Sequence, residues 1–136
     1  MLRREPRTRD ILRELLRRNY RPPFSADEIE ECAIAVMSPS ELIEAGAGAA
    51  SAAAMAVFSS VSWDAVDAVL DRYCRAGCKH YHKLRDGEGD GCLACGCAGK
   101  KLRTKIKSGY FPCPVDLFTP VTISAIAREV DHGQQA

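Results

Sequence analysis

Cysteine is concentrated in one part of this chain. Six of the seven cysteines lie between residues 74 and 113, and only Cys32 stands apart. In a reducing compartment, thiols clustered in this way predict a bound metal ion rather than disulfides. No basic segment followed by an apolar run opens the sequence, so we expect a cytoplasmic setting. The first prediction is therefore a fold stabilised by a metal ion.

The spacing of these cysteines and of two nearby histidines is typical of zinc ligands. Thiolates and imidazoles that arrive as closely spaced pairs suit tetrahedral zinc, and the candidates are numerous enough for two ions. We expect a first site from Cys74, Cys78, Cys92 and Cys95, and a second from Cys97, Cys113, His80 and His82. An exchange of ligands between the two sites remains open.

The pair Cys92 and Cys95 gives the strongest local signal. Gly96 follows it directly, and a tight turn at this point lets backbone amides approach the thiolates. The turn is similar to a zinc knuckle, but this resemblance covers a handful of residues and names a local geometry, not a family. The acidic run over 86–91 imitates the opening of a calcium loop, yet its twelfth position is Cys97, so we interpret it as a glycine-rich turn.

Two other states of the cysteines remain open. A compact cysteine run and the pair Cys113-Pro114 also fit an iron–sulfur cluster. The cysteines can also be reduced thiols that hold no metal. Cys32 lies on the apolar stripe of its helix and is interpreted as a small buried hydrophobe.

The pattern outside the cysteine cluster predicts a mostly α, small helical domain with a zinc-knuckle-like Cys/His segment and room for one short β-hairpin. A chain of 136 residues is the usual size of a single domain, 1–136. Within it we expect a basic N-terminal helix in 1–24, a helical core in 25–73, the metal-binding segment in 74–114 and a C-terminal helix in 115–136.

Polar residues mark where several of these helices should begin. Thr8 is the expected N-cap of the first helix, Ser25 and Ser38 each open a capping box, and Ser62 caps a fourth helix. The third helix is expected to run to Phe58, and most of it lies in an uncharged stretch from Ala45 to Trp63 that is rich in alanine, glycine and serine. Helices of this composition pack inside soluble proteins, so we expect it to be the central element, kinked or split near its glycines, and expect no membrane contact. The C-terminal helix should start at Thr119-Pro120 and end before Gly133.

The net charge of +1 hides four blocks of alternating sign: +5 over 1–24, −8 over 25–72, +6 over 73–113 and −2 over 114–136. Segregated charge creates local fields that can attract an acidic protein or nucleic acid. The segment 100–107 fits a strand or a helix equally well. The candidate partner-binding residues are Lys100, Lys101, Arg103, Lys105 and Lys107, together with Arg13 and Arg17 of the first helix.

No catalytic constellation accompanies the candidate metal ligands. A zinc deaminase needs glutamate two residues after its histidine, and here His80 is followed by Tyr81 and His82. We therefore expect a non-enzymatic, zinc-stabilised binding protein: an adaptor, inhibitor or regulator that acts on an acidic protein surface or on nucleic acid, with no small-molecule substrate. The alternatives are an iron–sulfur redox or sensor protein and, further, a zinc-dependent enzyme.

Overall fold

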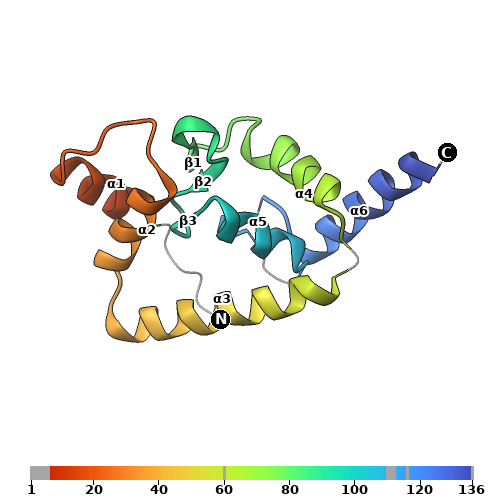
Figure 1. Ribbon diagram of the computed structural model, residues 1–136, viewed down its shortest axis with the longest axis horizontal. Coiled ribbons are helices and arrows are strands. Elements are labelled where there is room, and N and C mark those ends of the chain that lie inside the picture. Colours follow the sequence, from red (N-terminus) through yellow and green to blue (C-terminus); the bar gives the residue numbers. More distant parts are fainter. Residues whose placement is uncertain (1–6, 60, 110–112, 116, 136) are drawn as a thin grey trace.

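The computed structural model describes residues 7–59, 61–109, 113–115 and 117–135, with side chains in the last helix described to residue 132. The chain is mostly helical, as predicted (Figure 1). Its helices are α1 (Thr8–Arg17), α2 (Ala26–Ala35), α3 (Pro39–Phe58), α4 (Trp63–Val69), α5 (Lys100–Lys107) and α6 (Pro120–Gln135). Two short helical turns supplement them: η1 (Leu70–Cys74), which continues α4 as a π-helical turn, and η2 (Arg85–Gly87).

A small antiparallel sheet lies between the helices and is larger than the single hairpin anticipated from the sequence. Its strands are β1 (Tyr81–Lys83), β2 (Asp90–Cys92) and β3 (Cys97–Ala98), in the order β1-β2-β3. Cys92 is paired with Tyr81 on one side and with Cys97 on the other. The sheet therefore fixes the backbone positions of two of the candidate ligands.

Most helix starts follow the capping signals. Ser25 and Ser38 each form a complete capping box, and the Ser62 hydroxyl accepts a hydrogen bond from the Ala65 amide. The prediction for Thr8 was wrong: Arg7 is the N-cap residue of α1, and the Thr8 hydroxyl is hydrogen-bonded to His80 instead. A contact distant in sequence has replaced the local cap.

Two clusters of buried side chains form the core. The first joins α4, α5 and α6 around Val66, Leu70 and Ile123, and includes Cys97 and Cys113. The second joins α1 and α2 to the sheet; its members are Ile11, Leu15, Phe24, Ile29, Cys32, Ala33, Leu84, Leu93 and Ala98. Cys32 is fully buried there, as predicted for a small hydrophobe.

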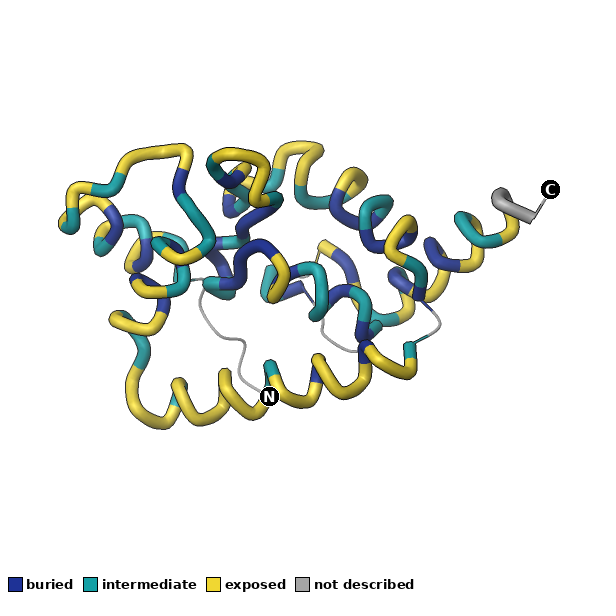
Figure 2. The backbone as a smooth tube through the Cα atoms, in the orientation of Figure 1, coloured by how far each residue is buried: buried dark blue, intermediate teal, exposed yellow. Residues whose placement is uncertain are grey.

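The expectation that α3 is the central element was wrong. α3 runs along one edge of the molecule and packs against α5, and most of it is exposed (Figures 1 and 2). Ala52 and Ala56 are its buried residues. The helix has too few large side chains on any one face to anchor it in the interior. By length and composition alone, α3 is long and apolar enough to cross a membrane, but core helices of soluble proteins pass the same test.

Three other details differ from expectation or settle an open choice. The glycines Gly46 and Gly48 neither kink nor split α3, which is continuous from Pro39 to Phe58. The segment 100–107 is the helix α5, with Leu102 and Ile106 buried one turn apart. The last helix does not end before Gly133, since α6 continues to Gln135.

Candidate metal centre

The fold gathers five of the six clustered cysteines from separate segments around one core. Cys74 is the last residue of η1, and Cys78 follows in the next turn. Cys92 and Cys97 lie on β2 and β3, and Cys95 lies in the turn between them. Cys113 precedes α6. Cys97 and Cys113 are buried in the first core cluster, and Cys74, Cys92 and Cys95 pack against it.

The thiols form two groups. Cys95 interacts with both Cys92 and Cys97, so the β2–β3 turn holds one group of three. Cys74 interacts with Cys113 and Cys78, which form the other. All seven cysteines of the chain are free thiols. Among the described residues, no three Cys, His, Asp or Glu side chains converge closely enough to hold a metal ion as they stand.

Burial and neighbouring thiols raise the pKa of Cys74, Cys95 and Cys97. The pKa of Cys74 is raised to about 12, chiefly by burial and next by the neighbouring Cys113. The pKa of Cys95 is also raised to about 12, first by its contact with Cys92, and that of Cys97 is raised by Cys95 and by burial. Each thiolate is unfavourable beside the next, so deprotonation of the cluster requires a compensating positive charge.

Lys105 supplies one such charge. Its ammonium Nζ lies 2.6 Å from the Cys97 sulfur, to which it donates a hydrogen bond. Burial pushes the pKa of Lys105 down, but the nearby Cys97 and Cys95 sulfurs outweigh burial and raise it. The contact holds α5 against the β2–β3 turn. It also means that Lys105 faces the thiols rather than an external partner.

The two candidate histidines flank the residue that pairs with Cys92, but their rings contact α1 and the second core cluster instead of the thiols. The His80 ring atom Nδ1 is 2.5 Å from the Thr8 hydroxyl of α1, and the ring is buried. The His82 ring packs against Phe24, a member of the second core cluster, with ring centroids 5.8 Å apart. Burial lowers the pKa of both histidines. Within the described part of the chain, the two imidazoles contact Thr8 and Phe24, and not Cys97 or Cys113, their expected companions in a second site.

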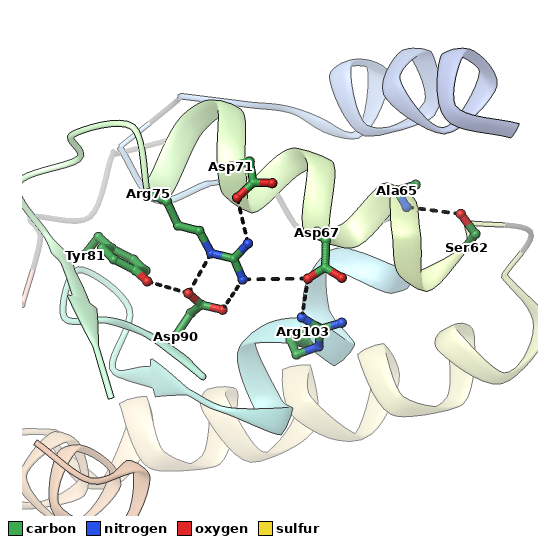
Figure 3. A network of polar contacts seen from close by, with 8 residues as sticks. All are labelled: Ser62, Ala65, Asp67, Asp71, Arg75, Tyr81, Asp90 and Arg103. Atoms are coloured by element: carbon green, nitrogen blue, oxygen red, sulfur yellow. Dashed lines mark hydrogen bonds and ion pairs between the residues drawn. The ribbon is translucent and has the colours of Figure 1, made fainter. Parts of the chain in front are cut away.

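A network of polar contacts connects the two segments that carry the thiol groups (Figure 3). The Asp90 carboxylate is buried and accepts hydrogen bonds from Arg75 Nε at 2.9 Å and Nη2 at 2.7 Å. The Tyr81 hydroxyl donates to the same carboxylate at 2.5 Å. Arg75 follows Cys74 in the chain, and Asp90 lies two residues before Cys92. The network therefore fixes the end of η1 relative to β2.

The network also perturbs the ionisation of its members. The two hydrogen bonds from Arg75 lower the pKa of Asp90 against the opposing effect of burial. Burial and the hydrogen bond to Asp90 raise the pKa of Tyr81 to about 12. The arginine extends the network to Asp71 at 2.8 Å, and Asp67 connects it to Arg103 at 2.6 Å. Asp90 therefore remains charged at neutral pH within a well-paired setting.

Most cations of α5 are occupied by internal contacts. Lys101 pairs with Glu30, Arg103 pairs with Asp67, and Lys107 donates to the Val61 carbonyl at 2.8 Å. Arg103 and Lys107 also lie over the ring of Trp63, at 5.5 and 5.2 Å from its centroid. Lys100 is exposed. On α1, Arg17 forms an ion pair with Glu14, whereas Arg13 is exposed.

Sequence reasoning missed Arg75, Asp90 and Lys105 as parts of this region. Asp90 was interpreted only as a turn residue, and Lys105 only as one of five surface charges. Their partners are 15 and 8 residues away in sequence. Helical or strand periodicity does not predict such distant pairs. The sequence shows only that Arg75 directly follows Cys74. Comparison with known proteins adds no relative: no family model, no curated protein and no solved structure matches the chain.

Proposed function

We propose that this chain is a zinc-stabilised binding protein of the cytoplasm that acts as an adaptor, inhibitor or regulator on an acidic protein surface, without catalysing a reaction. The observation that carries the proposal is the gathering of five thiols from separate segments around one buried core, with Cys78 in the turn after Cys74. Soft thiolate ligands at close spacing select zinc over the hard cations. Zinc bound there would fasten the β2–β3 turn to the end of η1.

A four-thiolate site would draw on both groups of cysteines, because each group contains three. The set Cys74, Cys78, Cys92 and Cys95 meets this condition, with one pair from each group. The Arg75–Asp90 contact supports it by holding the two pairs near each other. Closure of the site requires rotation of thiol side chains, accompanied by release of their protons, because zinc binds the thiolate. Cys97 and Cys113 would lie beside this site.

An acidic protein suits the charge pattern better than nucleic acid does. A phosphate track needs cations that are free to replace the counterions of the nucleic acid. On α5, by contrast, Lys101 and Arg103 already have carboxylate partners, and Lys105 faces Cys97. The exposed cations of the N-terminal region are better placed to meet carboxylates. This reasoning makes nucleic acid the second choice.

Chelation with controlled reloading tests the metal part of this proposal. The full chain, as purified, is treated with a strong zinc chelator, and unfolding by urea is followed by circular dichroism. We expect the urea midpoint to fall on chelation and to recover with one equivalent of zinc but not with magnesium. An unchanged midpoint would show that the fold does not depend on metal. Recovery with iron and sulfide alone, with a visible absorption band, would select the iron–sulfur alternative instead.

A further inference from the structure

A groove of about 630 Å³ lies between α1 and the residues that lead into β1. Its floor is apolar on the α1 side, where Leu12 and Leu16 lie one turn apart, and Leu16 is 43% exposed. Three cations surround this floor: Arg9 and Arg13 of α1, and Lys79 from the opposite wall. Among the described residues that line the groove there is no Asp or Glu. The surface thus combines an apolar strip with charged side chains that are all positive.

The cations of the groove differ from their neighbours in having no acid partner. Arg17 and Arg18 share Glu14, and Arg7 pairs with Glu41. Within the part of the chain that the structure describes, no ion pair or hydrogen bond occupies the side chains of Arg9, Arg13 or Lys79. Arg9 and Arg13 are four residues apart and so project from one face of α1. In the described part of the chain, Arg9 and Arg13 are thus the cations of α1 that have no acidic partner, and both line this groove.

The groove has a rigid base. On the reverse side of α1, Ile11 and Leu15 are fully buried in the second core cluster. The opposite wall is tied to α1 by the contact between Thr8 and His80, whose hydroxyl and Nδ1 atoms are 2.5 Å apart. Ile11 and Leu15 thus anchor the helix, while Leu16 is exposed at the groove and Leu12 lines the groove and also packs against the second cluster. A preformed surface of this kind loses little conformational entropy on binding.

From this geometry we infer that the groove is the docking site for an acidic, leucine-rich peptide segment of a protein partner. Apolar side chains of the segment cover Leu12 and Leu16, and its carboxylates pair with Arg9, Arg13 and Lys79. Guanidinium groups bind carboxylates through two parallel hydrogen bonds, which makes the paired arginines selective for this chemistry. The inference rests on the proposed binding function and assigns it to one surface.

The lining of the groove disfavours nucleic acid as its occupant. Proteins that hold single strands stack the bases on exposed aromatic rings. The aromatic side chain in this lining is His80, which is buried and bonded to Thr8. Leucine side chains form no hydrogen bond or ion pair with a phosphate backbone. They do suit the apolar face of an amphipathic peptide.

Fluorescence polarisation with the zinc-loaded full chain tests the inference. The probes are labelled synthetic peptides of three kinds (glutamate with leucine, glutamate with serine, and lysine with leucine) and a labelled single-stranded oligonucleotide. The double variant Arg9→Glu/Arg13→Glu removes the charge of the groove. The matched control, Lys83→Glu/Arg128→Glu, makes the same change in net charge at exposed cations of β1 and α6. Circular dichroism and zinc content verify that both variants fold and remain loaded.

We expect the glutamate–leucine peptide to bind wild type and the control variant within about threefold of each other, and the groove variant to bind at least about tenfold more weakly, as the loss of two charge-assisted contacts implies. Leu16→Ser should weaken the same peptide but not the glutamate–serine peptide. Zero-length carbodiimide coupling should join the bound peptide to Lys79 in preference to the exposed Lys83.

The contrary results separate the two proposals. Equal binding of the glutamate–leucine peptide by the groove variant and the control would overturn the groove as the site while leaving a binding function for acidic partners elsewhere. Tighter binding of the oligonucleotide, lost in the groove variant, would overturn the acidic peptide as the occupant. Concentration-dependent self-association lost in that variant would identify a second copy of the chain as the occupant instead. Failure of the zinc proposal appears separately, in the metal content of the wild type.

Discussion

Arg75 donates two hydrogen bonds to the buried Asp90 carboxylate, and this pair joins the helix end that carries Cys74 to the strand that carries Cys92. Asp90 is 3% exposed, and Tyr81 donates a third hydrogen bond to it. A buried carboxylate so fully satisfied contributes more to a defined geometry than an exposed pair can. We therefore propose that this contact holds the two thiol groups near each other before a metal ion binds.

Asp90→Asn should destabilise the protein by on the order of 2 to 3 kcal/mol, because Arg75 loses its buried carboxylate partner and keeps only the more exposed Asp71 and Asp67. Asp71→Asn removes an exposed carboxylate from the same arginine and should cost less than about 1 kcal/mol. Urea unfolding of zinc-loaded samples measures both. If the two variants lose the same unfolding free energy, Asp90 is no more important to the network than the exposed Asp71.

The cost of Asp90→Asn should depend on pH. Arg75 holds the pKa of Asp90 in the folded chain below its ordinary value of 3.8, which is close to that of the unfolded chain. The carboxylate therefore contributes stability above about pH 4, and that contribution is lost as pH falls through the lower, folded pKa. We expect the difference in unfolding free energy between wild type and Asp90→Asn to be constant from neutral pH down to about pH 5 and to shrink below about pH 4. A constant difference down to pH 2 would contradict this.

Gly96→Ala should disturb the turn that holds Cys95 and Cys97. Gly96 has a φ of +76°, and a Cβ there would lie 2.6 Å from the Ala33 Cβ of α2. Backbone strain and the close contact together should cost about 1 to 3 kcal/mol and weaken zinc binding. Gly46→Ala is the matched control, because that position of α3 is open and helical, and it should stabilise the chain by up to about 1 kcal/mol. Zinc affinity unaffected by Gly96→Ala would argue against a site at this turn.

Zinc binding should release protons in proportion to the thiols that bind. Because the pKa of Cys74 and that of Cys95 are both raised to about 12, these thiols are protonated at neutral pH and must lose their protons to the solvent. A weakly buffered titration with a pH indicator should show about four protons released per zinc. Cys95→Ala should reduce both the affinity and the proton count, whereas Cys32→Ala, in the second core cluster, should change neither. Loss of zinc from Cys32→Ala alone would place the site elsewhere.

Local signals in the sequence predicted the local structure well. The serines at 25, 38 and 62 each cap the helix expected of them, because a capping bond connects residues only three apart. The burial of Cys32 followed from helical spacing alone. The choice between strand and helix over 100–107 could not be made from its pattern, since Leu102 and Ile106 satisfy both periods.

Features set by long-range packing could not be predicted. α3 has the uncharged, alanine-rich composition expected of a core helix. Its short alanine side chains offer neighbouring helices little apolar surface to pack against, and the helix lies at the edge of the molecule. Thr8 has the chemistry of an N-cap, but His80, 72 residues away, takes its hydroxyl. The pairing of Arg75 with Asp90 is equally invisible to periodicity. For the candidate site, the sequence identified the thiols, while the contacts that organise them emerged only from the fold.

Whether thiolates of this chain hold zinc is measured by elemental analysis of protein purified without added metal. We expect at least one zinc per chain in the wild type, little iron, and loss of that zinc when Cys92 and Cys95 are both changed to alanine. Cys32→Ala should keep the full amount. A folded wild-type chain that carries neither zinc nor iron, and takes up no zinc when it is offered, would show that the fold holds no such site.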